Sequence, residues 1–159
     1  MRGFVIRSIA CMLMILAYQQ LAVPDQKLSV VERVIEFSVQ QEIKASNLAA
    51  HRDLCVGFGY GLIVDEGAII SSLKRKGTHI HENDWCNQGP RGIAIDILSP
   101  IHETSPGTYE VNVQIADLSL RPGEHFATLL KRGTYVVRCV ESSEPQIVSY
   151  RQTCCVKAS

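Results

Sequence analysis

The sequence predicts a single α+β domain in which a long N-terminal amphipathic helix packs on a curved antiparallel sheet of about four to six strands. Three observations predict this fold class. Apolar residues recur at helical spacing between residues 30 and 49, and Tyr109 to Ile115 alternate apolar with polar. Turn sequences such as Pro106-Gly107 separate the apolar runs after residue 92. A helix followed by consecutive hairpins is typical of a two-layer domain.

The first 22 residues have the pattern of a secretory signal peptide. Arg2 and Arg7 precede the apolar run Ile9–Tyr18, and the small residue Ala22 precedes a polar stretch. The run is shorter than the roughly 20 residues that span a bilayer. We therefore expect cleavage after Ala22, a mature domain over residues 23–159 and a secreted or periplasmic location. Membrane anchoring by residues 4–22 remains the alternative.

The first helix of the domain is predicted over about residues 30–49, and its start is defined by Ser29. Glu32 follows three positions later, which is the spacing of a capping box. An apolar stripe then predicts the face toward the sheet: Val31, Val34, Ile35, Val39 and Ile43. Most polar side chains are expected on the opposite face: Glu32, Arg33, Glu36, Gln40, Gln41 and Lys44.

The next segments alternate strand and helix signals. A strand is expected over residues 54–60, where Gly57, Gly59 and Gly61 indicate a bulge or close approach by another backbone. Asp65 is the expected N-cap of a short helix over residues 66–76. Short strand structure is expected near residues 78–81. Later strands are predicted over residues 92–99, 109–115, 126–131, 134–140 and 147–153, with a turn at Arg132-Gly133.

Six cysteines suggest a disulfide framework in an exported protein. Cys11 leaves with the signal peptide. A Cys55–Cys86 bridge is the first expectation, and its loop of roughly 30 residues would contribute about 3 kcal/mol in the chain-entropy model. Cys139 is expected to bridge to Cys154 or Cys155, which leaves one cysteine over. The alternative for the adjacent cysteines Cys154 and Cys155 is a redox role.

The sequence offers little that indicates catalysis. Lysine and arginine together number 16 and so do the acidic residues, so no basic surface for nucleic acid is predicted. There is no G-x-S-x-G, and no cofactor is expected. His79 and His81 could hold a metal ion if another side chain joined them. The candidates for that third ligand are His102, His125, Glu82 and Asp84.

Three aromatic residues are candidates for contact with a ligand or partner. Trp85 stands beside Cys86 in a polar segment, where it can cover a disulfide or anchor a partner. Phe58 and Tyr60 flank the glycines and could line a cleft between helix and sheet.

The order of the signal segment, the amphipathic helix, Leu54-Cys55-Val56, a short helix and Cys86 resembles small exported bacterial proteins of unknown function. The resemblance covers residues 30–140 and includes a hairpin over residues 131–137. The shape is similar to the cone-like folds of cystatin or nuclear-transport-factor (NTF2-like) type, although the cystatin motif Q-x-V-x-G is absent. Fold analogy alone does not define function.

The predicted function is an exported, disulfide-stabilised domain that binds a protein, a peptide or a small ligand rather than catalysing a reaction. One alternative is a small exported hydrolase that depends on a metal ion. The other is a membrane-anchored component of cell-envelope assembly.

Overall fold

The structure is a computed structural model that describes residues 27–50, 53–81, 92–119 and 128–155. The predicted signal peptide, Trp85, Cys86 and His125 lie outside the described residues. Within them, two α-helices and a six-stranded sheet form an α+β arrangement. The elements are α2 (Val30–Ala45), the short 3-10 helix η1 (Leu48–Ala50), β1 (Leu54–Phe58), α3 (Glu66–Arg75), β2 (Ile80–His81), β3 (Ile93–Ser105), β4 (Thr108–Asp117), β5 (Thr128–Arg138) and β6 (Gln146–Cys155).

The sheet is mixed, so the prediction of a wholly antiparallel sheet is wrong. The strand order is β2-β1-β3-β4-β5-β6, and β1 runs parallel to both β2 and β3. For β1 and β2 the reason is the connection through α3, since a helical crossover returns the chain in the same direction. A signal was present in Leu54-Cys55-Val56, which is continuously apolar and buried. Such runs are typical of parallel strands covered on both faces.

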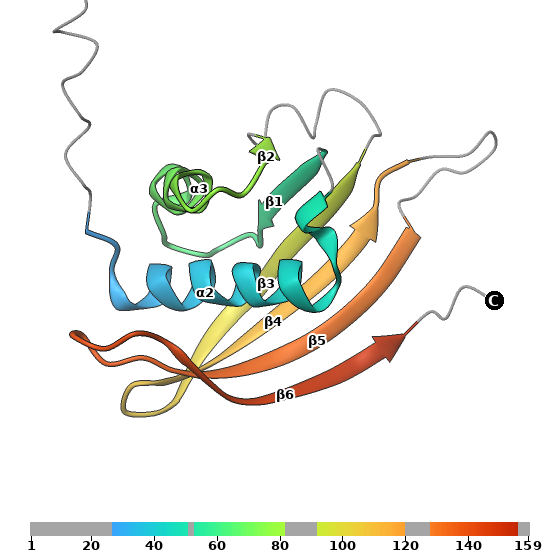
Figure 1. The fold of residues 1–159 in the computed structure, drawn as a ribbon. Coiled ribbons are helices and arrows are strands. Elements are labelled where there is room, and N and C mark those ends of the chain that lie inside the picture. The colour runs from blue at the N-terminus through green and yellow to red at the C-terminus, as the bar shows by residue number, and fades with distance from the viewer. Residues whose placement is uncertain (1–26, 51–52, 82–91, 120–127, 156–159) are drawn as a thin grey trace, which may run out of the picture.

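Helix α2 lies across the strands of the sheet (Figure 1). Val34, Ile35 and Val39 are completely buried in the core that the helix shares with the sheet. The helix begins with the expected capping box, in which Glu32 N–H donates to Ser29 Oγ at 3.3 Å and Ser29 N–H donates to the Glu32 carboxylate at 2.7 Å. It ends at Ala45, where the chain turns away before η1.

Helix α3 packs beside α2 near β1 and β2 (Figure 1). Its N-cap is Asp65, whose carboxylate accepts a hydrogen bond from Ala68 N–H at 2.9 Å. Ile69 and Leu73 are completely buried and join the core. Gly77 follows the helix with a φ of 82°, a left-handed conformation that favours glycine after a helix C-terminus.

Strand β5 runs without a break through Arg132-Gly133, so the predicted hairpin at this dipeptide is wrong. Gly133 pairs with Val113 of β4 on one side and with Gln152 of β6 on the other. The ring of Tyr150 lies across Gly133, because a Cβ added there would stand 2.5 Å from Tyr150 atoms. The glycine therefore makes room for an aromatic side chain inside a strand and does not form a turn.

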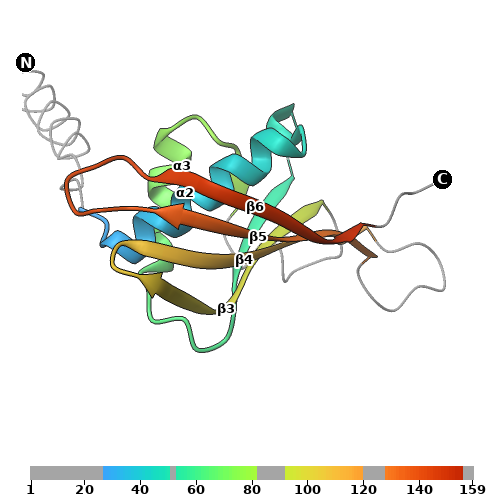
Figure 2. The same cartoon turned by 90° about the horizontal axis from the view of Figure 1, so that it is seen from below.

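Strand β6 is the outermost strand at one end of the sheet. Figure 2 views the molecule from this side and shows β6 in front of β5. It pairs only with β5 within the described residues, from Arg138 opposite Gln146 to Lys131 opposite Cys155. Its backbone groups on the outer side are therefore left without a strand partner.

Gly59 tests the close approach of two backbones. Its N–H donates to the Ile97 carbonyl at 2.7 Å, and an added Cβ would lie 2.6 Å from the Ser99 nitrogen. We expect Gly59→Ala to lower the free energy of unfolding by about 1–3 kcal/mol, because backbone cannot move aside cheaply. Urea denaturation of the mature domain measures this.

Gly67→Ala is the matched control for this substitution. Gly67 lies in the first turn of α3, where an added Cβ would come no closer than 3.4 Å to another residue. Alanine there should leave stability unchanged or raise it by up to about 1 kcal/mol. Equal stability of the two variants would contradict the account of Gly59.

Candidate functional site

Glu42 is a buried carboxylate that joins α2 to the sheet. Its side chain is 2% exposed. Oε1 accepts hydrogen bonds from Lys131 Nζ and from Ser46 Oγ, both at 2.6 Å, and Oε2 accepts one from Tyr135 O–H at 2.7 Å. A buried charge is tolerated only when it is paired and its oxygens are hydrogen-bonded. The arrangement around Glu42 meets both conditions.

Tyr150 extends this cluster toward the edge of the sheet. Its ring centroid lies 4.6 Å from that of Tyr135, and Lys131 Nζ stands 5.1 Å from the Tyr150 centroid. These distances fit an aromatic pair and a cation–π contact. Residues of α2, β5 and β6 thus meet in one polar and aromatic cluster.

In this cluster the pKa values of Lys131 and Tyr135 are both raised. Burial by itself lowers the pKa of Lys131, but the hydrogen bond and charge of Glu42 outweigh burial and raise it. Burial and donation to Glu42 raise the pKa of Tyr135 far above its usual range. Both groups are therefore protonated donors near neutral pH and do not act as bases. The geometry supports a structural tether between helix and sheet.

Two further glutamates of α2 join it to α3. Glu36 is buried, and its Oε1 accepts from Ser72 Oγ at 2.6 Å and pairs with Lys76 Nζ at 3.0 Å. Glu32 Oε1 accepts from Asp65 N–H at 2.8 Å. Burial raises the pKa of Glu32, but the N–H groups of Asp65 and Ser29 outweigh it, so the pKa is lowered. The expected solvent face of α2 is therefore partly an interface with α3.

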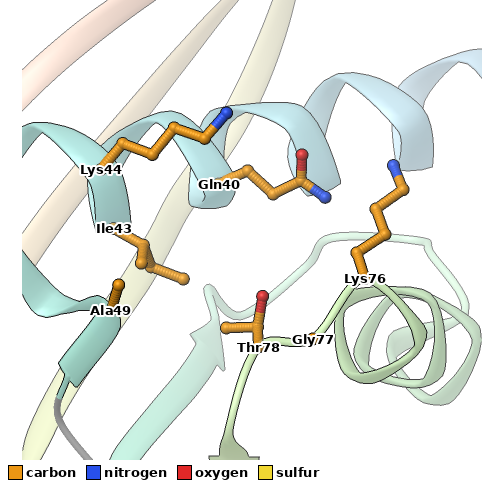
Figure 3. A pocket seen from close by; sticks show the side chains of 7 residues that line it. All are labelled: Gln40, Ile43, Lys44, Ala49, Lys76, Gly77 and Thr78. Carbon is orange, nitrogen blue, oxygen red and sulfur yellow. The ribbon is translucent and has the colours of Figure 1, made fainter.

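A cavity of about 260 Å³ lies between α2 and α3 (Figure 3). Its lining is Gln40, Ile43, Lys44, Ala49, Lys76, Gly77 and Thr78. A second hollow of about 430 Å³ shares Gln40, Lys44 and Lys76 with it. The Gln40 Nε2 atom is buried and has no hydrogen-bond partner. Lys44 forms no ion pair with any residue in the described ranges.

Phe58 and Tyr60, the two aromatic candidates that the structure describes, lie in different environments. Phe58 packs against the hydrophobic core, whereas Tyr60 is fully exposed after β1. Neither residue lines the cavity between α2 and α3. Trp85 lies outside the described residues, so its contact with a disulfide or partner stays a prediction.

The histidine pair lies at the β2 edge of the sheet. His79 is exposed directly before β2, and His81 Nε2 stands 3.4 Å from Asp53 Oδ1. Among the residues that the structure describes, no three His, Cys, Asp or Glu side chains gather to hold a metal ion. Glu82, Asp84 and His125 lie outside those residues, and His102 is opposite Glu110 in the β3–β4 ladder.

The described cysteines differ in oxidation state. Cys55 is disulfide-bonded, and its partner is not among the described side chains. Cys139 and Cys154 carry free thiols. The predicted Cys139–Cys154 bridge is not formed, because the β5–β6 register puts the two residues at opposite ends of the hairpin, on the order of 20 Å apart. The Cys155 side chain lies outside the description.

The sequence reasoning missed both the Glu42 cluster and the cavity lining. One signal for the cluster was available: Glu42 follows Val39 by three positions and precedes Ile43, so it falls on the apolar stripe of α2. An ionisable residue at a core position implies a buried partner. No comparable signal marked Gln40, Lys44 and Lys76, because polar residues on a helix surface are ordinary.

Comparison with known proteins finds no family model that matches this chain, no significantly similar curated protein and no significantly similar solved structure. Across the described residues, neither helix has the length and apolar character needed to cross a membrane.

The Glu42 cluster predicts loss of stability in alkali. The pKa values of Tyr135 and Lys131 are higher in the folded protein than in the unfolded chain. Above about pH 10 the unfolded chain therefore loses these protons first, so the free energy of unfolding falls as pH rises. Tyr135→Phe should cost about 1.5–3 kcal/mol at pH 7, where a hydrogen bond to a charged group is lost. It should also make the alkaline decline shallower.

Urea denaturation between neutral and alkaline pH measures both effects. Tyr60→Phe is the control, because Tyr60 is fully exposed and should give the wild-type profile. An unchanged profile in Tyr135→Phe would refute the structural role of the phenol.

Proposed function

We propose that this chain is an exported, disulfide-stabilised binding domain that takes an extended segment of a partner protein onto the edge of β6. One observation carries the proposal. Ile147, Val148 and Tyr150 of this edge strand are 42%, 60% and 37% exposed. A long apolar edge invites pairing with another chain, and natural proteins usually protect such edges. An exposed apolar patch also marks interaction surfaces in general.

The edge has few of the charges and prolines that protect other edges, although its register with β5 shifts at Val148 and at Thr153. Between Gln146 and Cys155 there is no proline, and Arg151 is the single charged residue. An added strand would gain main-chain hydrogen bonds along β6, and its alternate side chains would contact the exposed apolar residues. A partner of this kind is an extended segment with apolar residues at every second position. A helical partner could not use the free backbone groups.

The disulfide-bonded state of Cys55 supports the exported location, and we propose Cys86 as its partner. β1 and β2 put Cys55 opposite His81, five positions before Cys86 in the sequence. Cys155 is on β6, four strand spacings from β1 or roughly 19 Å. A disulfide needs Cα atoms within about 7 Å. Since Cys139 and Cys154 are free, Cys86 is the partner that we propose for the mature chain.

We propose in addition that the domain has the cone-like shape of the cystatin or nuclear-transport-factor type. The support is the amphipathic α2, whose apolar face packs on the same core as β4 and β5. In such an arrangement the concave face is filled by the helix, so the outer edge of the sheet remains available for partners.

The compartment and the bridge are tested by intact mass. We expect the exported protein to lack residues 1–22, and its non-reduced mass to be lower than the reduced mass by the pair of hydrogen atoms that one disulfide removes. Peptide mapping should link Cys55 to Cys86, and Cys139 and Cys154 should react with an alkylating agent after denaturation without reductant. A full-length mass with every thiol free would contradict export.

Strand addition is tested by selecting peptides from a random library on the mature domain. Selected peptides should protect β6 amides from hydrogen exchange. Val148→Lys should weaken their binding at least about tenfold, which corresponds to about 1.4 kcal/mol, because a charge on the edge opposes pairing.

Val140→Lys is the matched control, since Val140 is 52% exposed but lies after β5 and outside the strand. Peptides that bind both variants as well as wild type would refute the proposal. Concentration-dependent dimers that Val148→Lys abolishes would assign the edge to a second copy of this chain and overturn the peptide partner.

A further inference from the structure

We propose that the cavity between α2 and α3 binds a small organic molecule with a single carboxylate group. This inference concerns a different surface from β6 and does not depend on a protein partner. It arises from three properties of the cavity: the hydrogen-bond donors in its lining, its net charge, and its size and apolar wall (Figure 3).

The free polar groups of the lining include three donors. Gln40 Nε2 is buried without a partner. Lys44 Nζ and the Thr78 hydroxyl likewise make no hydrogen bond or ion pair with any described residue. A buried donor that lacks an acceptor costs roughly 1–3 kcal/mol. Because the nitrogen has almost no accessible surface, the Gln40 amide would have to turn toward the cavity, and an acceptor oxygen of a ligand there would then remove that cost.

The charge of the lining selects a monoanion. Lys76 Nζ is 3.0 Å from Glu36 Oε1, so this ammonium is already balanced by a buried carboxylate. Lys44 then remains as the one uncompensated charge among the lining residues. One positive charge with neutral donors beside it matches a single carboxylate, in which a charged acceptor strengthens each hydrogen bond. A cation would meet Lys44 and be repelled.

The remaining wall limits the size of the ligand and gives it an apolar end. Ile43 is almost completely buried, and Ala49 stands beside it in the lining. The cavity of about 260 Å³ is below the roughly 300–1,000 Å³ of pockets for drug-sized ligands. A short aliphatic acid fits these limits, with Lys44 as the counter-ion of its carboxylate and Ile43 as the apolar contact of its chain.

Butyrate and its neutral analogue butyramide are suitable probes. We expect butyrate to shift the amide resonances of Gln40, Ile43, Lys44 and Thr78 saturably when it is titrated into the ¹⁵N-labelled mature domain. Butyramide should bind at least about tenfold more weakly, because it lacks the charge. Lys44→Gln should weaken butyrate to the same extent while leaving the fold intact, since Lys44 is exposed and unpaired.

Lys27→Gln is the matched control. Lys27 is an exposed lysine that precedes the opposite end of α2, and its removal should leave butyrate binding unchanged. Gln40→Leu gives a second variant, in which the orphaned donor is lost and butyrate affinity should fall.

Four results would each overturn the proposal: no saturable shift, equal binding of butyramide, equal binding by Lys44→Gln, or equal weakening by Lys27→Gln. Inorganic phosphate should not compete at equal concentration, and competition would point to a general anion site instead.

Discussion

The arrangement of this domain depends on the burial of the Glu42 carboxylate between helix and sheet. Residues of an α-helix are 100° apart around its axis, so Gln40 and Lys44 each lie about 200° from Glu42. Once Lys131 and Tyr135 hold Glu42 against β5, the rotation of α2 is fixed, and Gln40 and Lys44 must lie on the side away from the sheet. A different rotation would leave a buried charge unpaired, at a cost of several kcal/mol. The cavity is therefore positioned by a contact on the opposite face of the same helix.

Three glutamates of α2 each fix the orientation of this helix relative to a different part of the structure. Glu42 contacts the sheet, Glu36 contacts Ser72 of α3 and the C-cap Lys76 that follows it, and Glu32 contacts the α3 N-cap at Asp65. Apolar packing alone is non-directional and tolerates sliding between layers. Carboxylates that accept short hydrogen bonds are directional, so three of them specify how the two helices and the sheet meet. Polar side chains thus give this small domain its uniqueness, while the apolar core supplies most of the driving force.

The sequence predicted local structure well and long-range pairing poorly. The capping box at Ser29, the Asp65 cap and the turn at Pro106-Gly107 are determined by neighbouring residues, and the structure has all three elements. The parallel pairing of β1 and the unbroken β5 depend on distant partners, in the second case on the Tyr150 ring above Gly133. Prediction of the candidate site from the sequence was limited for the same reason, because the site depends on contacts between distant segments. A stripe of residues reveals which helix face is buried, but it does not reveal that Gln40 and Thr78 line one cavity, because no local pattern encodes the packing of their two segments.

The pairing of β1 also has a consequence for the order of assembly. β3 to β6 form an antiparallel meander in which each strand pairs with its neighbour along the chain, so each pairing closes a short loop. β1 instead pairs at Val56 with Ile95, 39 positions later, and its other neighbour follows α3. The entropy of loop closure favours the meander as the earlier unit and delays the docking of β1. A bridge from Cys55 would then act late, by locking the last strand to arrive into a sheet already formed.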